Sequence, residues 1–234
     1  MNPLDHFETI LTVNPQVELH QQFDTDKQLS GLLHERMLII RAWPTQGVIL
    51  GKLDTVLPGF VDGMAYLQRQ SLPVMIRKAG GLGVVCDEDV LNLTFLLSKH
   101  HPIYGGLHAS YTLAVELIRY FLKGYGIEPE AKAIPQSYCP GDYDLSVDGK
   151  KIAGIAQFRS KEAVMVMATL AVGGDQAQRC ALMRGFYERA NLNQDPTYPD
   201  IDPKVMVTLN TVIGQHLSVD EVWDTITTTV SSRE

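Results

Sequence analysis

The spacing of apolar and polar positions predicts five strands in the first hundred residues. These are residues 36–43, 48–50, 74–76, 84–86 and 90–97. The first is almost wholly apolar, as a buried strand is, and we expect the second to be its short partner. In the fifth, apolar residues alternate with Asn92 and Thr94, so one face is apolar and the other partly polar. The first thirty residues are polar and irregular, and we expect them to pack loosely.

Helical periodicity is strongest over residues 107–125. Tyr111, Ala114, Ile118 and Phe121 fall on one side of such a helix, and the glycines that follow can end it. Similar spacing and end signals predict further helices at residues 60–70, 176–190, 203–213 and 219–228, the last with Ser218 as its N-cap.

The middle of the chain contains a hairpin signal. Residues 143–147 and 151–155 have strand character and are joined by Asp148-Gly149, a pair typical of two-residue turns. Residues 163–172 add an apolar strand. Strands interspersed with helices predict an α+β fold with a mixed sheet. No linker-like stretch divides the 234 residues, so we expect one domain.

Composition narrows the function. A hydrophobic share of 45% allows a full core, and a net charge of -7 argues against a nucleic-acid partner. The three cysteines are widely spaced, which argues against a disulfide framework or a structural zinc site and favours a reducing, cytosolic setting. No signal-peptide pattern and no run of ~20 apolar residues is present, so no membrane partner is expected.

One cysteine, Cys139, stands in a setting suited to reactivity. It precedes a Pro-Gly turn, and the second strand of the hairpin opens on Lys150 and Lys151. Only the thiolate is a good nucleophile, and a nearby ammonium is one way to lower a resting pKa of about 8.5. Strand pairing should place Lys151 near Ser146. The loop before the hairpin must therefore fold back if the Cys139 thiol is to meet the Lys151 ammonium. An inert buried thiol and a solvated lysine remain the alternatives.

Other candidates are weaker. The segment RKAGGLGVVCD at residues 77–87 lacks the phosphate-binding ending and the dinucleotide spacing, so it is either a loop that a ligand approaches closely or a tight turn. The histidines are not spaced so that two of them are expected to bind one metal ion. Asp142 and Asp144 lie two apart, and turn stabilisation, partner binding and acid–base chemistry all stay open for them.

Two segments, RKAGGLGVVCDEDVLNLTFLL and SYCPGDYDLSVDGKKIAGIAQFR, resemble the biotin/lipoate protein ligase superfamily. Within it they resemble the octanoyltransferases, or lipoyl amidotransferases, that take the acyl group from the glycine-cleavage H protein. The likeness runs from about Trp43 to the C-terminal helices. It implies one ligase-type catalytic domain over residues 1–234, with about 30–215 as its core and a central mixed sheet flanked by helices.

The resemblance also implies roles for individual residues. In that family the cysteine of the SYCPG run carries the acyl group as a thioester, and Cys139 stands there. A lysine twelve residues later lowers the pKa of that thiol, and Lys151 stands there. Substrate binding is implied for Arg77, Gly80, Gly81, Leu82, Gly141, Tyr143 and Asp144.

Two positions depart from the family pattern. Phe158 replaces a residue that is commonly basic, so one basic contact is expected to be missing. Cys86 stands where other types often carry histidine, and we interpret it as a packed residue rather than a second nucleophile.

The implied activity moves an octanoyl or lipoyl group from a lysine of glycine-cleavage H protein to lysines in lipoyl domains of 2-oxo acid dehydrogenases. It needs no ATP, metal or other cofactor. Backbone N–H groups of residues 80–82 or 139–141 would stabilise the oxyanion. The alternatives are transfer from octanoyl-acyl carrier protein, ATP-dependent lipoate–protein ligation, and a non-catalytic module that binds lipoyl domains.

Overall fold

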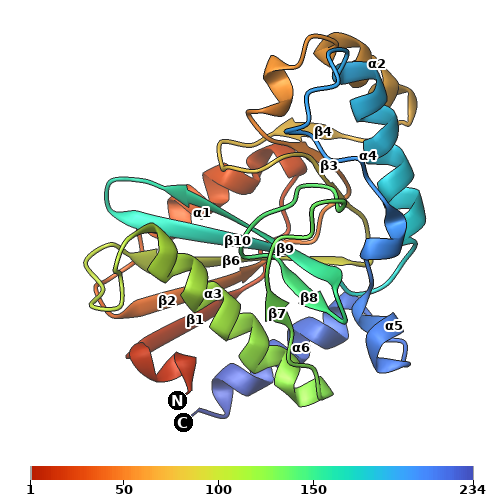
Figure 1. Cartoon of the computed structure of the whole chain (residues 1–234). Helices are drawn as coiled ribbons and strands as arrows, with labels where there is room; N and C mark the ends of the chain where they lie inside the picture. The colour runs from red at the N-terminus through yellow and green to blue at the C-terminus, as the bar shows by residue number, and fades with distance from the viewer. Residues whose placement is uncertain (1, 234) are drawn as a thin grey trace.

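The computed structural model describes residues 2–233 and contains two sheets of different size (Figure 1). The larger, seven-stranded sheet has the order β1-β2-β6-β10-β9-β8-β7, and the smaller, three-stranded sheet has the order β4-β3-β5. The large sheet consists of β1 (Thr9–Val13), β2 (Met37–Ala42), β6 (Val90–Ser98), β7 (Glu130–Ala131), β8 (Leu145–Val147), β9 (Lys150–Arg159) and β10 (Ala163–Ala171). The small sheet consists of β3 (Gly47–Leu50), β4 (Val74–Ile76) and β5 (Val84–Cys86).

Six α-helices cover these sheets in the described chain. They are α1 (Gln22–Ser30), α2 (Phe60–Arg69), α3 (Leu107–Leu122), α4 (Gln176–Ala190), α5 (Leu209–Ile213) and α6 (Val219–Ser231). Helices α2 and α4 pack on each other beside the small sheet, at the upper right of Figure 1. Strands and helices are interspersed around a mixed sheet, which confirms the expected α+β class. None of the helices in residues 2–233 is long and apolar enough to cross a bilayer.

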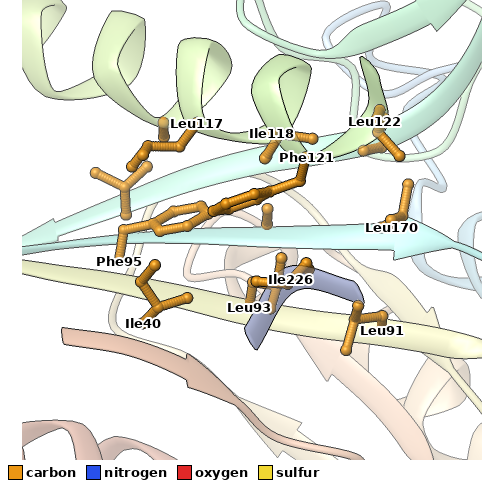
Figure 2. Close-up of a cluster of buried hydrophobic side chains, with 14 of the residues drawn as sticks. Ile40, Leu91, Leu93, Phe95, Leu117, Ile118, Phe121, Leu122, Leu170 and Ile226 are labelled. Atoms are coloured by element: carbon orange, nitrogen blue, oxygen red, sulfur yellow. The ribbon is translucent and has the colours of Figure 1, made fainter. Parts of the chain in front are cut away.

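The main core lies between α3 and one face of the large sheet. Figure 2 shows Phe121 of α3 meeting Phe95 of β6, with Leu93 and the α6 residue Ile226 close by. All four side chains are almost fully buried. Burial of each such side chain contributes about 1.5–3 kcal/mol, so this layer fixes the position of β6 against α3 and α6.

Polar groups gather on the opposite face of the large sheet. The guanidinium of Arg41 on β2 contacts Asp26 of α1 at 2.6 Å, and both side chains are buried. Burial raises the pKa of Asp26, although the charge of Arg41 opposes it. Thr94 of β6 accepts a hydrogen bond from the indole of Trp43 at 3.0 Å. The partly polar side of β6 is therefore buried as well.

Several predicted elements are confirmed. The strands at residues 74–76 and 84–86 and the helix Gln176–Ala190 have the expected bounds. Asp148 and Gly149 have φ of 49° and 74°, as a tight hairpin turn requires. Ser218 caps α6, and its side chain accepts the Glu221 N–H.

Three expectations were wrong. The first thirty residues are ordered into the fold, because β1 pairs in parallel with β2 and Leu4 and Phe7 are buried. Strand β3 pairs with β4 and β5 rather than with β2. Residues 203–213 are not one helix: a 3-10 turn and α5 are separated where the Val207 N–H donates to the Lys151 carbonyl at 2.9 Å.

Candidate active site

A pocket lies between the polar face of the large sheet and the small sheet, with Cys139 in its wall. Its lining is mainly apolar, with Arg77 and Thr169 as further polar members. The apolar lining consists of Phe23, Trp43, Ile49, Val84, Ile155, Ala156 and Met167. Phe158 is partly buried and packs against Ala156 and Met167 beside the pocket, so it extends the apolar surface at the position where a basic contact was expected to be missing.

Cys139 is half-buried and stands on a strained turn. Its φ is 51°, in the left-handed region that non-glycine residues rarely occupy. Its Sγ accepts a hydrogen bond from the Leu82 N–H at 3.1 Å and lies 3.5 Å from Nη2 of Arg77. The structure thus brings the predicted cysteine and the predicted glycine-rich loop together.

The loop residue Gly81 has to be a glycine for two reasons. Its φ is 88°, which L side chains avoid. A Cβ there would lie 2.6 Å from Arg77 Nη2 and 2.9 Å from Cys139 Sγ. The glycine-rich segment is therefore a loop of close approach and not only a turn between strands.

Lys151 reaches the backbone around Cys139. Its ammonium donates to the carbonyl oxygens of Cys139 at 2.7 Å and Tyr138 at 3.1 Å, and it pairs with Asp144 at 2.7 Å. Both charged side chains are almost completely buried. Because an ammonium has three donors, these contacts use all of them. Lys151 therefore holds the unusual Cys139 turn in place.

The predicted fold-back of the loop occurs at Gly141. The Asp144 N–H donates to the Gly141 carbonyl at 3.0 Å, and the Gly141 N–H donates to the Asp144 carboxylate at 2.9 Å. Strand pairing sets Ser146 opposite Lys151, as expected from the hairpin. Burial raises the pKa of Asp144, and the charge of Lys151 opposes that shift.

Of the seven predicted binding residues, Arg77 lines the pocket and the other six do not, with Tyr143 and Gly80 also outside the contacts around Cys139. Tyr143 stacks on Tyr111 of α3 with ring centroids 4.5 Å apart, and its hydroxyl contacts His108 at 2.6 Å. Gly80 is exposed, and a Cβ there would meet nothing within 4 Å. Their assignment to substrate binding stays a prediction.

The other two cysteines are buried, and burial disfavours their thiolate forms. Burial raises the pKa of Cys86 to about 12 and that of Cys180 to about 11. Cys86 packs between strands in the cluster around the small sheet, which confirms its interpretation as a packed residue. No group of three metal-binding side chains occurs in the part of the chain that the structure describes.

Sequence reasoning missed a buried acid beneath the glycine-rich loop. Asp54 opens the 3-10 helix Asp54–Val56 and is fully buried. Its carboxylate accepts the Gly51 N–H at 2.7 Å and the Tyr187 hydroxyl at 2.8 Å. Tyr187 lies 133 positions away on α4, so no local pattern pointed to the pair.

We expect Asp54 to make the native state less stable as the pH rises through the weakly acidic range. Burial raises the pKa of Asp54 from 3.8 to about 6, against the opposing effects of Gly51, Tyr187 and Arg77. The folded protein then binds this proton more tightly than the unfolded chain does. The resulting stabilisation is complete below about pH 4 and is lost as the pH passes about 6, an effect of about 3 kcal/mol.

Urea unfolding of the wild type and of Asp54→Asn, at about pH 4 and about pH 7, measures this contribution. The pKa values of Tyr187 and Tyr198, which face Asp54, are raised, so both stay protonated over this range, and the variant has no acid at position 54. The wild type should lose more stability than the variant between the two pH values. Equal losses would contradict a raised pKa for Asp54.

The fold and the sequence together establish the family. The model described as "Lipoyl protein ligase A/B catalytic domain" matches residues 19–231, and the chain belongs to that family. The crystal structure of lipoate-protein ligase A bound with ATP aligns with a TM-score of 0.68, covering 97% of this chain and 85% of that one. At 16% identity this similarity concerns the fold.

Two relatives are closer in sequence. Octanoyl-[GcvH]:protein N-octanoyltransferase of Macrococcus caseolyticus is 41% identical over 188 residues, which are 79% of this chain and 68% of that protein. Lipoyl-[GcvH]:protein N-lipoyltransferase of Listeria monocytogenes is 37% identical over 214 residues, 89% of this chain and 77% of that protein. The chain is an acyltransferase of this family, as the resemblance of its motifs implied.

Proposed function

We propose that this chain moves an octanoyl or lipoyl group from a lysine of the glycine-cleavage H protein to a lysine of a lipoyl domain, through a thioester on Cys139. One observation carries the proposal. A half-buried thiol stands in the wall of an apolar pocket, and the Leu82 N–H and the Arg77 guanidinium both face its sulfur. The named activities of the two relatives support the donor and the transferred group.

The reaction exchanges one amide for another and therefore needs no ATP. The Cys139 thiolate attacks the acyl carbonyl of the donor, a C–S bond forms, and the C–N bond breaks. The donor lysine leaves as its amine after taking a proton from water, and the neutral acceptor amine later returns a proton to water. The acceptor lysine then attacks the thioester, so a new C–N bond forms and the thiolate returns. Two covalent steps of this kind give ping-pong kinetics.

Leu82 and Arg77 would be the groups that stabilise the oxyanion. Both face Sγ, and the Nε–H of Arg77 is buried with no hydrogen-bond partner within residues 2–233. The Gly141 N–H already donates to Asp144. The glycine-rich loop instead offers the Leu82 N–H, which already faces the sulfur, as a donor for the developing charge.

The apolar lining of the pocket suits an acyl chain, and its cavity of about 20 Å³ would have to widen to admit one. Trp43, Ile49 and Met167 belong to three different strands or strand ends and face one space. Each CH₂ group that leaves water for such surroundings contributes about 0.8 kcal/mol. The chain of the substrate would thus supply binding energy, while the thiol and its donors act on the carbonyl.

Lys151 acts in this proposal by fixing the nucleophile turn. Its three donors are occupied by two carbonyl oxygens and Asp144, so protonation of the leaving amine would require one of these contacts to break. An effect of its positive charge on the thiol comes in addition to this positioning role.

Intact-mass measurement after incubation with octanoylated H protein, without ATP, tests the proposal. We expect a gain of one octanoyl group, located on Cys139 by peptide mapping. Later addition of an unmodified lipoyl domain should remove the group from the chain and transfer it to the acceptor.

The controls separate the rival donors. If the chain gains the octanoyl mass only from octanoyl-acyl carrier protein, the acyl carrier protein and not H protein is the donor. Modification of the lipoyl domain only in the presence of ATP and free octanoate or lipoate would replace transfer by ligation. If no adduct forms in any of these cases, the interpretation that remains is a non-catalytic module that binds lipoyl domains.

A further inference from the structure

The glycine-rich loop is held from below by two side chains that do not line the pocket. Tyr187 of α4 is 6% exposed, and Asp54 is fully buried. The Tyr187 oxygen accepts the Gly83 N–H at 3.1 Å. The Tyr187 hydroxyl in turn donates a hydrogen bond to the Asp54 carboxylate, 2.8 Å away. The donor and the acceptor of both hydrogen bonds in this series are thereby set.

The peptide group between Leu82 and Gly83 is fixed at both ends. Its carbonyl oxygen accepts from Nη2 of Arg77 at 3.0 Å, and its N–H donates to Tyr187. Rotation of this peptide plane would break both bonds. Since the next N–H toward the N-terminus is the one that faces Cys139, a fixed plane here limits where the Leu82 N–H can point.

The same carboxylate controls the other side of the loop. The second oxygen of Asp54 accepts the Gly51 N–H at 2.7 Å. Gly51 packs so closely on the loop that a Cβ there would lie 1.9 Å from the Gly81 carbonyl oxygen. Asp54 thus connects two supports, one under Gly81 and one, through Tyr187, under Gly83.

We propose that Tyr187, oriented by Asp54, is a positioning residue for acyl transfer that aims the Leu82 N–H at the oxygen of the carbonyl group whose carbon Cys139 attacks. The inference rests on the proposed function. Neither residue lines the pocket. Their effect should therefore fall on the chemical step and not on binding of the acyl donor.

Tyr187→Phe tests this directly. The ring and its packing against Phe186 and Tyr198 are kept, while the Gly83 N–H loses its acceptor. Single-turnover octanoylation by octanoylated H protein, followed by intact mass, gives the maximal rate and the half-saturating donor concentration. We expect the rate to fall about 10- to 100-fold, since a misdirected oxyanion donor costs somewhat less than a deleted one, and half-saturation to stay unchanged.

Tyr198→Phe is the matched control. It also removes one tyrosine hydroxyl from this region, but that hydroxyl donates to the Leu53 carbonyl at 2.7 Å and does not touch the loop. Its rate should stay within about twofold of the wild type. Should Tyr187→Phe not fold, Asp54→Asn replaces it, because the amide cannot serve both Gly51 and Tyr187 as an acceptor without reorienting one of them.

The outcomes are separable. A slower rate with unchanged half-saturation in Tyr187→Phe, or in Asp54→Asn in its place, supports the inference. The inference is overturned if Tyr187→Phe has the wild-type rate, if only its half-saturating donor concentration changes, or if Tyr187→Phe and Tyr198→Phe lose rate equally. In each of these cases the wild type still forms the adduct, so the proposed function stands. A wild type that never forms the adduct overturns the proposed function and this inference with it.

Discussion

Replacing Cys139 with alanine is expected to abolish acyl transfer while the fold stays intact. The side chain is half-buried in the pocket wall and supports no core cluster as a fully buried member. Loss of a nucleophile lowers rates by at least about 10³-fold, because the remaining donors have no attacking group to assist. Transfer of octanoyl from H protein to a lipoyl domain, measured by mass, should fall to background.

Cys139→Ser and Cys180→Ala complete this test. The serine hydroxyl keeps the shape of the thiol but is far less acidic, so its rate should also be very low. Cys180 is fully buried against Met206 Sδ at 3.5 Å, and its replacement should lower stability but preserve the adduct. Retained transfer in Cys139→Ala, with circular dichroism unchanged, would refute the thioester route.

Replacing Asp144 with asparagine is expected to cost about 3–5 kcal/mol of stability, because it leaves the Lys151 ammonium buried without its counter-charge. Urea unfolding measures the loss. The control is Asp142→Asn, which removes a carboxylate from the same turn at an exposed position and should change stability by less than about 0.5 kcal/mol. Similar losses of unfolding free energy in both variants would show that the buried ion pair contributes no more to stability than the exposed carboxylate does.

A double variant separates stability from function at this pair. Asp144→Leu with Lys151→Met removes both charges, and apolar replacement of a buried ion pair often restores stability. The carbonyl oxygens of Tyr138 and Cys139 would still lack their donor, so the Cys139 turn should relax and transfer should stay low. A stable double variant that transfers at the wild-type rate would exclude a positioning role for Lys151.

Local patterns predicted most of the elements but not all of their partners. Strand β6 and helix α3 follow from apolar spacing, because one face of each meets the main core. The N-terminal strand β1 was missed, since its few apolar positions make a weak signal until β2 pairs with them. Strand β3 was assigned to the wrong sheet, because short apolar strands look alike whichever sheet they join.

The candidate site divides in the same way. Cys139, Lys151 and the loop that begins at Arg77 were named from the sequence, because turn residues and family motifs mark them locally. Sequence reasoning assigned Lys151 to the thiol, and the structure directs its ammonium to two carbonyl oxygens and a carboxylate. Asp54 and Tyr187 carried no signal at all.

By itself, the sequence determined the α+β class and the family, and it named the cysteine that we propose as the nucleophile. These depend on periodicity, turn chemistry and residues that lie within one segment. Only the tertiary structure decided which groups surround the thiol. Leu82 and Arg77 are 57 and 62 positions from Cys139, and Tyr187 is 104 positions from Gly83. Such contacts form when packing removes water from several segments at once and each buried polar group must find a partner among those that remain.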